Sequence, residues 1–243
     1  MELINLKEII TDSLRYSASD LKMVVLLGLV LLLADVANDI SFTGVIADEL
    51  RLVFFATVIL LAIFEAGYIF RILEETIQGS NKLPKFNNLK LMFIHGIKEL
   101  TVLILYFLTP FLFFCFFYLY FLNSLDFNYP SIITDIFFLL ILSLTIVIYV
   151  FFPAVLLHRA HNNGNFRSSF DFREIYQKIR AVGLKRLIVV YLGLFLVVSI
   201  IKTVLQTGVA ENLPFLGELI SDLIIAPYLL IFTTRVLGLI DQP

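Results

Sequence analysis

Two long stretches without a single charged side chain constrain the fold most strongly. Residues 100–122 and residues 136–157 are dominated by aliphatic and aromatic side chains and contain no Asp, Glu, Lys or Arg. Each stretch is long enough to cross the hydrocarbon core of a bilayer, which is about 30 Å thick, as an α-helix. Strands of a membrane β-barrel would be shorter and would alternate apolar with polar residues. The sequence therefore predicts an all-α integral membrane protein.

The composition of the whole chain agrees with this class. Hydrophobic residues make up 60% of the 243 residues and charged residues 16%, with a mean hydropathy of +0.95. Soluble domains have roughly 45–50% apolar and about 25% charged residues. The net charge of −2 argues against a nucleic-acid partner, which would require a basic face. The single cysteine, Cys115, excludes a disulfide within the chain.

Six transmembrane helices are predicted, near residues 21–40, 51–73, 99–122, 134–157, 185–206 and 216–238. Of the 18 lysines and arginines, 16 would lie on one side of the membrane, and only Arg51 and Lys202 on the other. By the positive-inside rule, this bias places both termini in the cytoplasm and the protein in the cytoplasmic membrane. No connecting segment is long enough for a soluble domain, so residues 1–243 are predicted to form a single polytopic membrane domain.

The chain also repeats one pattern three times, over residues of about 4–75, 86–161 and 170–238. Each unit starts with an amphipathic segment that ends in a lysine, and its second span ends in an arginine. Apolar residues at spacings of three and four would let each first segment lie in the headgroup layer as an interfacial helix on the cytoplasmic side. The predicted unit is this helix followed by a helical hairpin. The alternative stays open, because any hairpin membrane protein has basic residues at its inner ends.

Several short motifs carry a family resemblance. They are EIITDSLRY at residues 8–16, GYIFR at 67–71, Gly79, LPKF at 83–86 and FIHGIK at 93–98. Together they resemble an archaeal family of multi-pass membrane proteins, catalogued as domain of unknown function 4013. The resemblance covers most of the chain and is most specific at residues 67–98. It implies an archaeal cytoplasmic membrane and carries no activity, so it assigns no catalytic residue.

Three arginines, Arg71, Arg159 and Arg235, are candidate lipid- or anion-binding residues, since each ends an even-numbered span. A long basic side chain at the inner leaflet reaches lipid phosphates and fixes the depth of its helix. If the three helices are neighbours, the arginines would instead form one shared site for an anion or a lipid headgroup. Both interpretations remain open at this point.

Four ionisable residues within the predicted spans are further candidates, because a charge in the hydrocarbon core is costly. They are Glu65, Asp35, Lys202 and Asp222. Counted from the inner ends at about 1.5 Å per residue, Asp35 and Asp222 lie about 20 Å deep, Lys202 about 25 Å and Glu65 only about 9 Å. These depths predict a cluster of Lys202 with Asp222 or Asp35, from which Glu65 is separate. The alternative is that the three deeper groups lie at the outer interface.

The chain contains no recognised catalytic or cofactor-binding motif, such as G-x-S-x-G, H-E-x-x-H or a Walker motif. We therefore expect no catalytic residue, no metal and no cofactor. The composition and the amphipathic segments favour a non-enzymatic membrane scaffold or membrane-associated accessory protein. The alternatives are a small-solute or ion transporter or channel subunit, and an enzyme that acts on lipid headgroups. The expected partners are the bilayer and its anionic headgroups, and the sequence identifies no protein partner.

Overall fold

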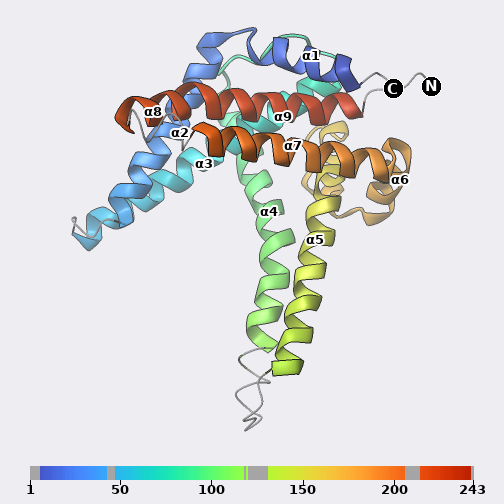
Figure 1. Ribbon diagram of the computed structural model, residues 1–243. Helices are drawn as coiled ribbons and strands as arrows, with labels where there is room; N and C mark the ends of the chain where they lie inside the picture. The colour runs from blue at the N-terminus through green and yellow to red at the C-terminus, as the bar shows by residue number, and fades with distance from the viewer. Residues whose placement is uncertain (1–5, 43–46, 118, 120–130, 206–213, 242–243) are drawn as a thin grey trace.

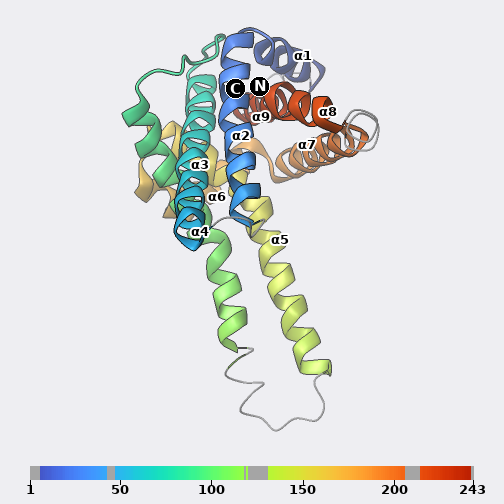
Figure 2. The ribbon, with the colours of Figure 1, turned by 90° about the vertical axis from the view of Figure 1, so that its left-hand side faces the viewer.

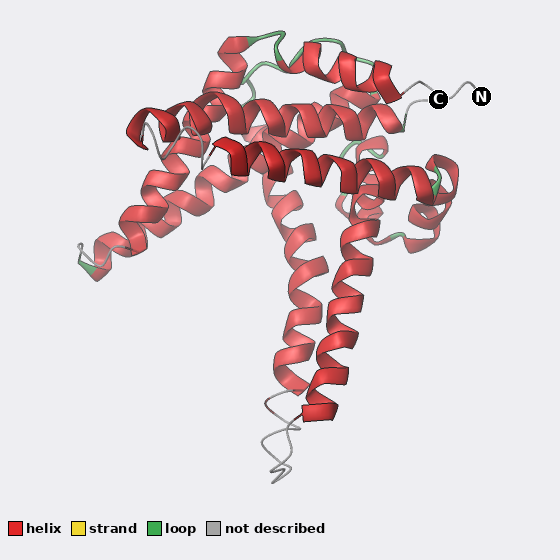
Figure 3. Cartoon of the chain, in the orientation of Figure 1, coloured by secondary structure: helices red, strands yellow, loops and turns green. Residues whose placement is uncertain are grey.

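The computed structural model describes residues 6–42, 47–117, 119, 131–205 and 214–241. Within these residues the chain forms helices joined by turns and loops, and it contains no β-strand (Figure 3). The helices are α1 (Leu6–Ser17), α2 (Leu21–Phe42), α3 (Asp48–Ile77), α4 (Leu89–Phe117), α5 (Ser131–His161), α6 (Phe172–Val182), α7 (Leu184–Leu205), α8 (Pro214–Ile220) and α9 (Ala226–Ile240). A 3₁₀ turn, η2 (Phe166–Phe170), precedes α6, and a π-helical segment, η4 (Ser221–Ile225), joins α8 to α9.

Six helices among the described residues are long and apolar enough to cross a membrane, and they fall at the six predicted positions. The sixth span is composite, because η4 interrupts it between α8 and α9. Pro227 lies in the first turn of α9, where a helix needs no backbone N–H donor and tolerates proline. The predicted ends of the third span beyond residue 119 and of the fifth beyond residue 205 lie outside the described residues.

The long helices lie side by side as α2 with α3, α4 with α5 and α7 with α9, and the three pairs diverge from one end of the molecule (Figures 1 and 2). Figure 1 shows α4 and α5 extending away from the other helices, whereas α7 and α9 run across their inner ends. The sixth span, η4 with α9, is the most buried, since half of its most apolar stretch is buried, against 11% for α3. The three pairs meet at the end of the molecule that holds the C-terminal turns of α3 and α9, which we call the inner end without reference to a side of the membrane.

α3 and α4 cross with their backbones in contact, at Gly67 and Gly96. A Cβ atom on Gly67 would lie 1.9 Å from the carbonyl oxygen of Met92, and one on Gly96 would lie 1.8 Å from that of Ile63. Each glycine thus contacts the carbonyl group of the residue four positions before the other glycine: Gly67 contacts Met92, and Gly96 contacts Ile63. Close approach through small residues is a common way for membrane helices to associate. The crossing falls within the sequence region that carries the strongest family resemblance.

The amphipathic segment predicted before the second hairpin does not form a separate helix. α4 runs unbroken from Leu89 through Lys98 into the apolar stretch, and Met92 is buried against α3. The reason is that residues 89–98 contain no proline, and their one glycine, Gly96, packs against α3 at the crossing, so the helix continues. Before the first and third pairs, α1 and α6 are separate helices.

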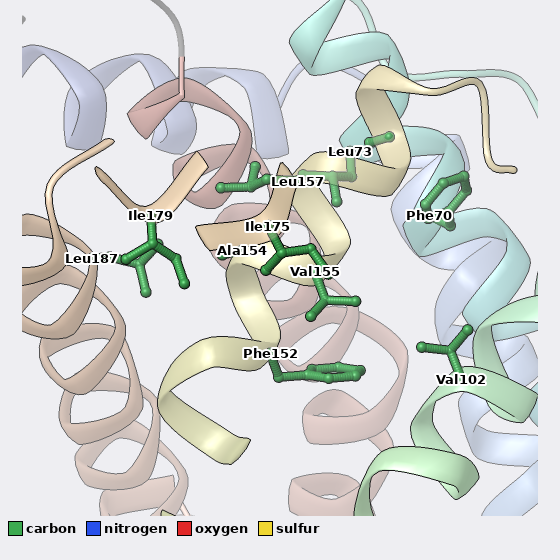
Figure 4. Packing of buried hydrophobic residues seen from close by; sticks show 11 residues of the cluster. Phe70, Leu73, Val102, Phe152, Ala154, Val155, Leu157, Ile175, Ile179 and Leu187 are labelled. Atoms are coloured by element: carbon green, nitrogen blue, oxygen red, sulfur yellow. The ribbon is translucent and has the colours of Figure 1, made fainter. Parts of the chain in front are cut away.

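A buried hydrophobic cluster joins α6 to the membrane helices at the inner end (Figure 4). Ile175 and Ile179 of α6 are each only 4% exposed, and they pack with Leu187 of α7 and Val155 of α5. The apolar stripe of α6, expected to face lipid, therefore faces protein. Phe70 of α3 extends the same cluster toward α4.

Candidate functional site

All three predicted arginines lie around the C-terminal turns of α3 and the residues that follow. Arg71, within α3, donates from Nε to Glu75 Oε1 at 3.0 Å. Its Nη1 donates to the carbonyl oxygens of Lys85 and Asn87 at 3.1 and 3.2 Å, and to Asn87 Oδ1 at 2.8 Å. Arg71 therefore fastens the connection between α3 and α4 to the side of α3.

Arg235 reaches the same end of α3 from α9, with its side chain only 2% exposed. It donates to the carbonyl oxygen of Ser80 and, at 3.0 Å, to Asn81 Oδ1. Its Nε donates to Asp12 Oδ2 at 2.9 Å, and its guanidinium carbon lies 4.2 Å from the centroid of the Tyr16 ring. A cation at a helix C-terminus is favourable, because the last carbonyl groups carry partial negative charge. Arg235 thus ties α1, α3 and α9 together.

Arg159 approaches α3 from α5 and is completely buried. Its Nη1 lies 2.7 Å from Glu99 Oε1 of α4, and its guanidinium carbon lies 4.6 Å from the centroid of the Phe70 ring. None of the nitrogens Nε, Nη1 and Nη2 makes a hydrogen bond to a described residue, although Nη1 lies beside Glu99, and His95 Nδ1 likewise has no hydrogen-bond partner among the described residues. The Glu99 carboxylate is therefore the counter-charge of the buried Arg159 guanidinium, and the Phe70 ring makes a cation–π contact with it.

We refer to Arg71, Arg159 and Arg235, with Asp12, Glu75 and Glu99, as the arginine hub. The arginines do gather around one structural element, as the shared-site interpretation required. The groups that bind them are carboxylates and carbonyls of the chain itself, and the side chains of Arg159 and Arg235 are closed to solvent. The sequence does not predict these partners, because carboxylates near basic residues are also typical of solvated helix ends.

Three of the four intramembrane candidates line one cavity of about 520 Å³. Asp35 comes from α2, Glu65 from α3 and Asp222 from η4. We call this the acidic cavity; its other polar lining residues are Asn38, Ser221 and Thr233, and apolar side chains of α2, α3, α7 and α9 complete the wall. α7 contributes Val198, whereas the side chain of Lys202 lies outside the described part of the structure.

The predicted separation of Glu65 from Asp35 and Asp222 is wrong. The prediction takes Arg71 as the inner end of the helix that contains Glu65. This helix, α3, continues to Ile77. Glu65 is 77 − 65 = 12 residues from that end, or about 18 Å at about 1.5 Å per residue. Asp35 is 35 − 21 = 14 residues from the start of α2, or about 21 Å. Counted from the ends of their own helices, the two carboxylates therefore lie at similar positions along α2 and α3, which run side by side, and both line the acidic cavity.

Asp222 owes its place in the cavity to the π-helical segment η4. A Cβ atom on Gly28 of α2 would lie 2.2 Å from the carbonyl oxygen of Leu223, so α2 and η4 touch through their backbones. π-Helical turns are rare and frequently occur at functional sites. The widened turn and the glycine contact together bring the start of the sixth span against α2, and Asp222 and Asp35 both line the cavity.

Two of the histidines, His158 and His161, make polar contacts at the C-terminal end of α5. His161 Nε2 of α5 lies 2.5 Å from Asp241 Oδ2, and Lys178 Nζ of α6 lies 2.6 Å from Asp241 Oδ1. His158 Nε2 lies 3.3 Å from the side-chain amide of Asn162. Among the described residues, no group of His, Cys, Asp and Glu side chains is arranged to hold a metal ion.

Comparison with known proteins gives one family. The model of the family described as "Protein of unknown function (DUF4013)" matches residues 51–207, which is more than half of the chain. The match includes Glu65, the Gly67–Gly96 crossing and the Glu99–Arg159 pair. No curated protein and no solved structure matches the chain.

Proposed function

We propose that this chain, which belongs to the DUF4013 family of proteins of unknown function, transports a small cationic solute across the membrane or forms a subunit of a channel for one. The acidic cavity carries the proposal. It brings together three carboxylates from separate segments of the chain, at a depth where ionisable groups are rare and costly. The family assignment supplies no activity, so the chemistry of the cavity has to indicate the solute.

The charge of the cavity favours a cation. A carboxylate among apolar side chains is stable only when it is paired, hydrogen-bonded or protonated. A bound cation would pair with the carboxylates of Asp35 and Glu65, whereas an anion would not.

The size and the wall of the cavity favour a small organic ammonium ion over a bare metal ion. Its volume of about 520 Å³ lies within the range of about 300–1,000 Å³ that is typical of small-molecule sites. Apolar side chains such as Leu31, Ala62 and Val198 make up much of the wall. An alkylammonium ion would place its charge at the carboxylates and its alkyl groups against these side chains.

The position of the cavity supports transport. It lies between the α2–α3 pair and the helices of the last pair, with the interrupted sixth span on one side. Many transporters bind their solute near the midplane, between repeated units and beside a discontinuous helix. The combination of η4 with Asp222 corresponds to that arrangement.

The proposal includes the architecture expected from the sequence. We infer three repeated helical hairpins, α2–α3, α4–α5 and α7–α9, with α1 and α6 as interfacial helices before the first and third. Both short helices bury one stripe and expose the adjacent face, which carries Leu6, Ile10 and Leu14 in α1 and Phe172 and Tyr176 in α6. The bias of lysine and arginine supports a cytoplasmic location for both termini and for the arginine hub.

Uptake by proteoliposomes tests the proposal. The purified protein is reconstituted, and uptake of radiolabelled methylammonium and of radiolabelled sodium is compared with protein-free liposomes. We expect methylammonium uptake, and we expect Glu65→Gln to reduce it at least tenfold. Glu49→Gln is the matched control, since Glu49 lies on the same helix but is exposed and lies outside the cavity.

Two results would contradict a transport function. One is uptake of both solutes no faster than in protein-free liposomes. The other is equal methylammonium uptake by the Glu65→Gln and Glu49→Gln proteins. Sodium uptake that depends on Glu65 would retain transport and would replace the organic ammonium ion with a metal cation.

A second candidate is a non-enzymatic membrane scaffold. The arginine hub favours it, because its charged groups contact one another and hold five elements, α1, α3, α4, α5 and α9, at one end of the molecule. Such a hub would keep the three helix pairs in fixed positions for other membrane components. This role predicts no solute uptake and no effect of Glu65→Gln.

A further inference from the structure

α6 lies between two candidate membrane spans and is tied closely to the second. The candidate span within α5 ends at His161, and the one in α7 begins at Leu184. α6 ends at Val182, so only Gly183, with a φ of 90°, separates it from α7. The C-terminus of α6 must therefore lie at the boundary of the membrane.

One face of α6 exposes aromatic and basic side chains together. Phe172 and Tyr176, which are one turn apart, are 68% and 51% exposed. Arg173 and Arg180 are also exposed. The guanidinium carbon of Arg180 lies 4.6 Å from the centroid of the Tyr176 ring, and its Nη2 donates to the Tyr176 hydroxyl at 2.9 Å. We call these four residues the aromatic–basic face.

The two exposed arginines of α6, Arg173 and Arg180, lie on the same side of the helix as its aromatic rings, whereas Lys178 lies on the other side and pairs with Asp241. At about 100° per residue, Tyr176, Arg180 and Arg173 follow Phe172 within about a quarter of the helix circumference. The acidic residue Glu174 lies about 160° from Phe172 on the same count. The buried stripe of Ile175 and Ile179 borders Phe172 on the other side. The aromatic rings therefore have positive charge on one side and the protein core on the other.

We propose that the aromatic–basic face of α6 binds the headgroups of anionic phospholipids in the bilayer that contains the protein. Aromatic side chains favour the headgroup level of a membrane, and nearby arginines attract anionic lipids. The bilayer is the occupant because α6 continues into α7 at the membrane boundary, and because the charge of the face is complementary to phosphate. This inference rests on the interfacial position of α6 in the proposed architecture, and it does not depend on the transport of a solute.

The absence of tryptophan from the chain allows a direct test. Phe172→Trp introduces a single tryptophan on the aromatic–basic face. Gln177→Trp is the matched control, since Gln177 is exposed on the same helix about 140° away. Each protein is reconstituted into vesicles of phosphatidylcholine and into vesicles of phosphatidylcholine with phosphatidylglycerol. Tryptophan emission is then measured with brominated lipid and with acrylamide as quenchers.

We expect the tryptophan of Phe172→Trp to emit at shorter wavelength than that of Gln177→Trp. It should be quenched by brominated lipid and shielded from acrylamide, more strongly when phosphatidylglycerol is present. High salt should remove the effect of phosphatidylglycerol, because it screens the arginines. Adding Arg173→Gln and Arg180→Gln should also remove that effect without lowering the thermal stability, since both side chains are exposed.

Two outcomes would overturn the proposal. One is equal access of acrylamide to both tryptophans with no difference between the two vesicle compositions. The other is a Phe172→Trp tryptophan shielded from both quenchers, in detergent as well as in vesicles, which would show that protein covers this face.

Discussion

Asp12 and Arg235 form an ion pair between the first and last described helices, although 223 residues separate them in the chain. The two sides of the pair are not equivalent, because the side chain of Arg235 is 2% exposed and that of Asp12 is 47% exposed. Arg235 also donates to Ser80 and Asn81, which follow α3. The guanidinium is therefore the central group, and Asp12 is one of several partners.

Arg235→Met should destabilise the protein far more than Asp12→Asn. Loss of the guanidinium leaves four partners, Asp12, Thr76, Ser80 and Asn81, without their donor and should cost about 3 kcal/mol, whereas a half-exposed pair contributes about 1 kcal/mol or less. Unfolding in detergent, followed by heat or denaturant, measures both variants. Equal losses would indicate that the ion pair alone accounts for the role of Arg235.

The Glu99–Arg159 pair should behave differently, because both partners are buried. Arg159→Met alone should lower stability by about 3–5 kcal/mol, since it leaves the Glu99 carboxylate without its cation. The double variant Glu99→Leu with Arg159→Met should regain most of that loss, because apolar replacement of a whole buried pair is often neutral. The same unfolding measurement applies. A double variant less stable than either single variant would argue against this explanation.

The sequence predicted the elements better than their contacts. Long uncharged runs identify membrane helices because the bilayer imposes both length and hydropathy, and all six spans were predicted. The sequence did not predict that α4 continues through residues 89–98, or that Glu65 lines the same cavity as Asp35. Both features depend on where α3 meets its neighbours. Glu99 gave no sequence signal, because a carboxylate beside Lys98 is also typical of a solvated helix end.

The Gly67–Gly96 crossing should not tolerate a side chain at either glycine. Gly96→Ala places a Cβ 1.8 Å from the Ile63 carbonyl oxygen, so α3 and α4 must separate, at a cost of about 1–3 kcal/mol. Gly193→Ala in α7 is the control, because no atom lies within 4 Å of its added Cβ and alanine is the better helix former. Thermal unfolding should separate the two variants. A Gly96→Ala protein as stable as Gly193→Ala would contradict the crossing.

Tyr16 should make the protein less stable at alkaline pH. Burial raises the pKa of Tyr16 from 10.0 to about 12, although nearby Arg235 acts in the opposite direction. Above pH 10 the unfolded chain loses this proton while the folded protein keeps it, so stability falls until the pH passes about 12. Tyr16→Phe should flatten that fall, and Tyr176→Phe, at an exposed position, should not. The measurement is the unfolding temperature of the three proteins across this range. The same dependence of unfolding temperature on pH for wild type and Tyr16→Phe would contradict the raised pKa of the Tyr16 hydroxyl.

Gly28→Ala should impair the acidic cavity without removing any carboxylate. Its Cβ would lie 2.2 Å from the Leu223 carbonyl oxygen, and backbone atoms cannot yield as the end of a side chain can. η4 would have to move away from α2 and carry Asp222 away from Asp35 and Glu65. We expect methylammonium uptake by Gly28→Ala proteoliposomes to fall about as far as with Asp222→Asn, while Gly193→Ala remains at the wild-type rate. If Gly28→Ala kept full uptake while Asp222→Asn lost it, the contact with η4 would not be what positions Asp222.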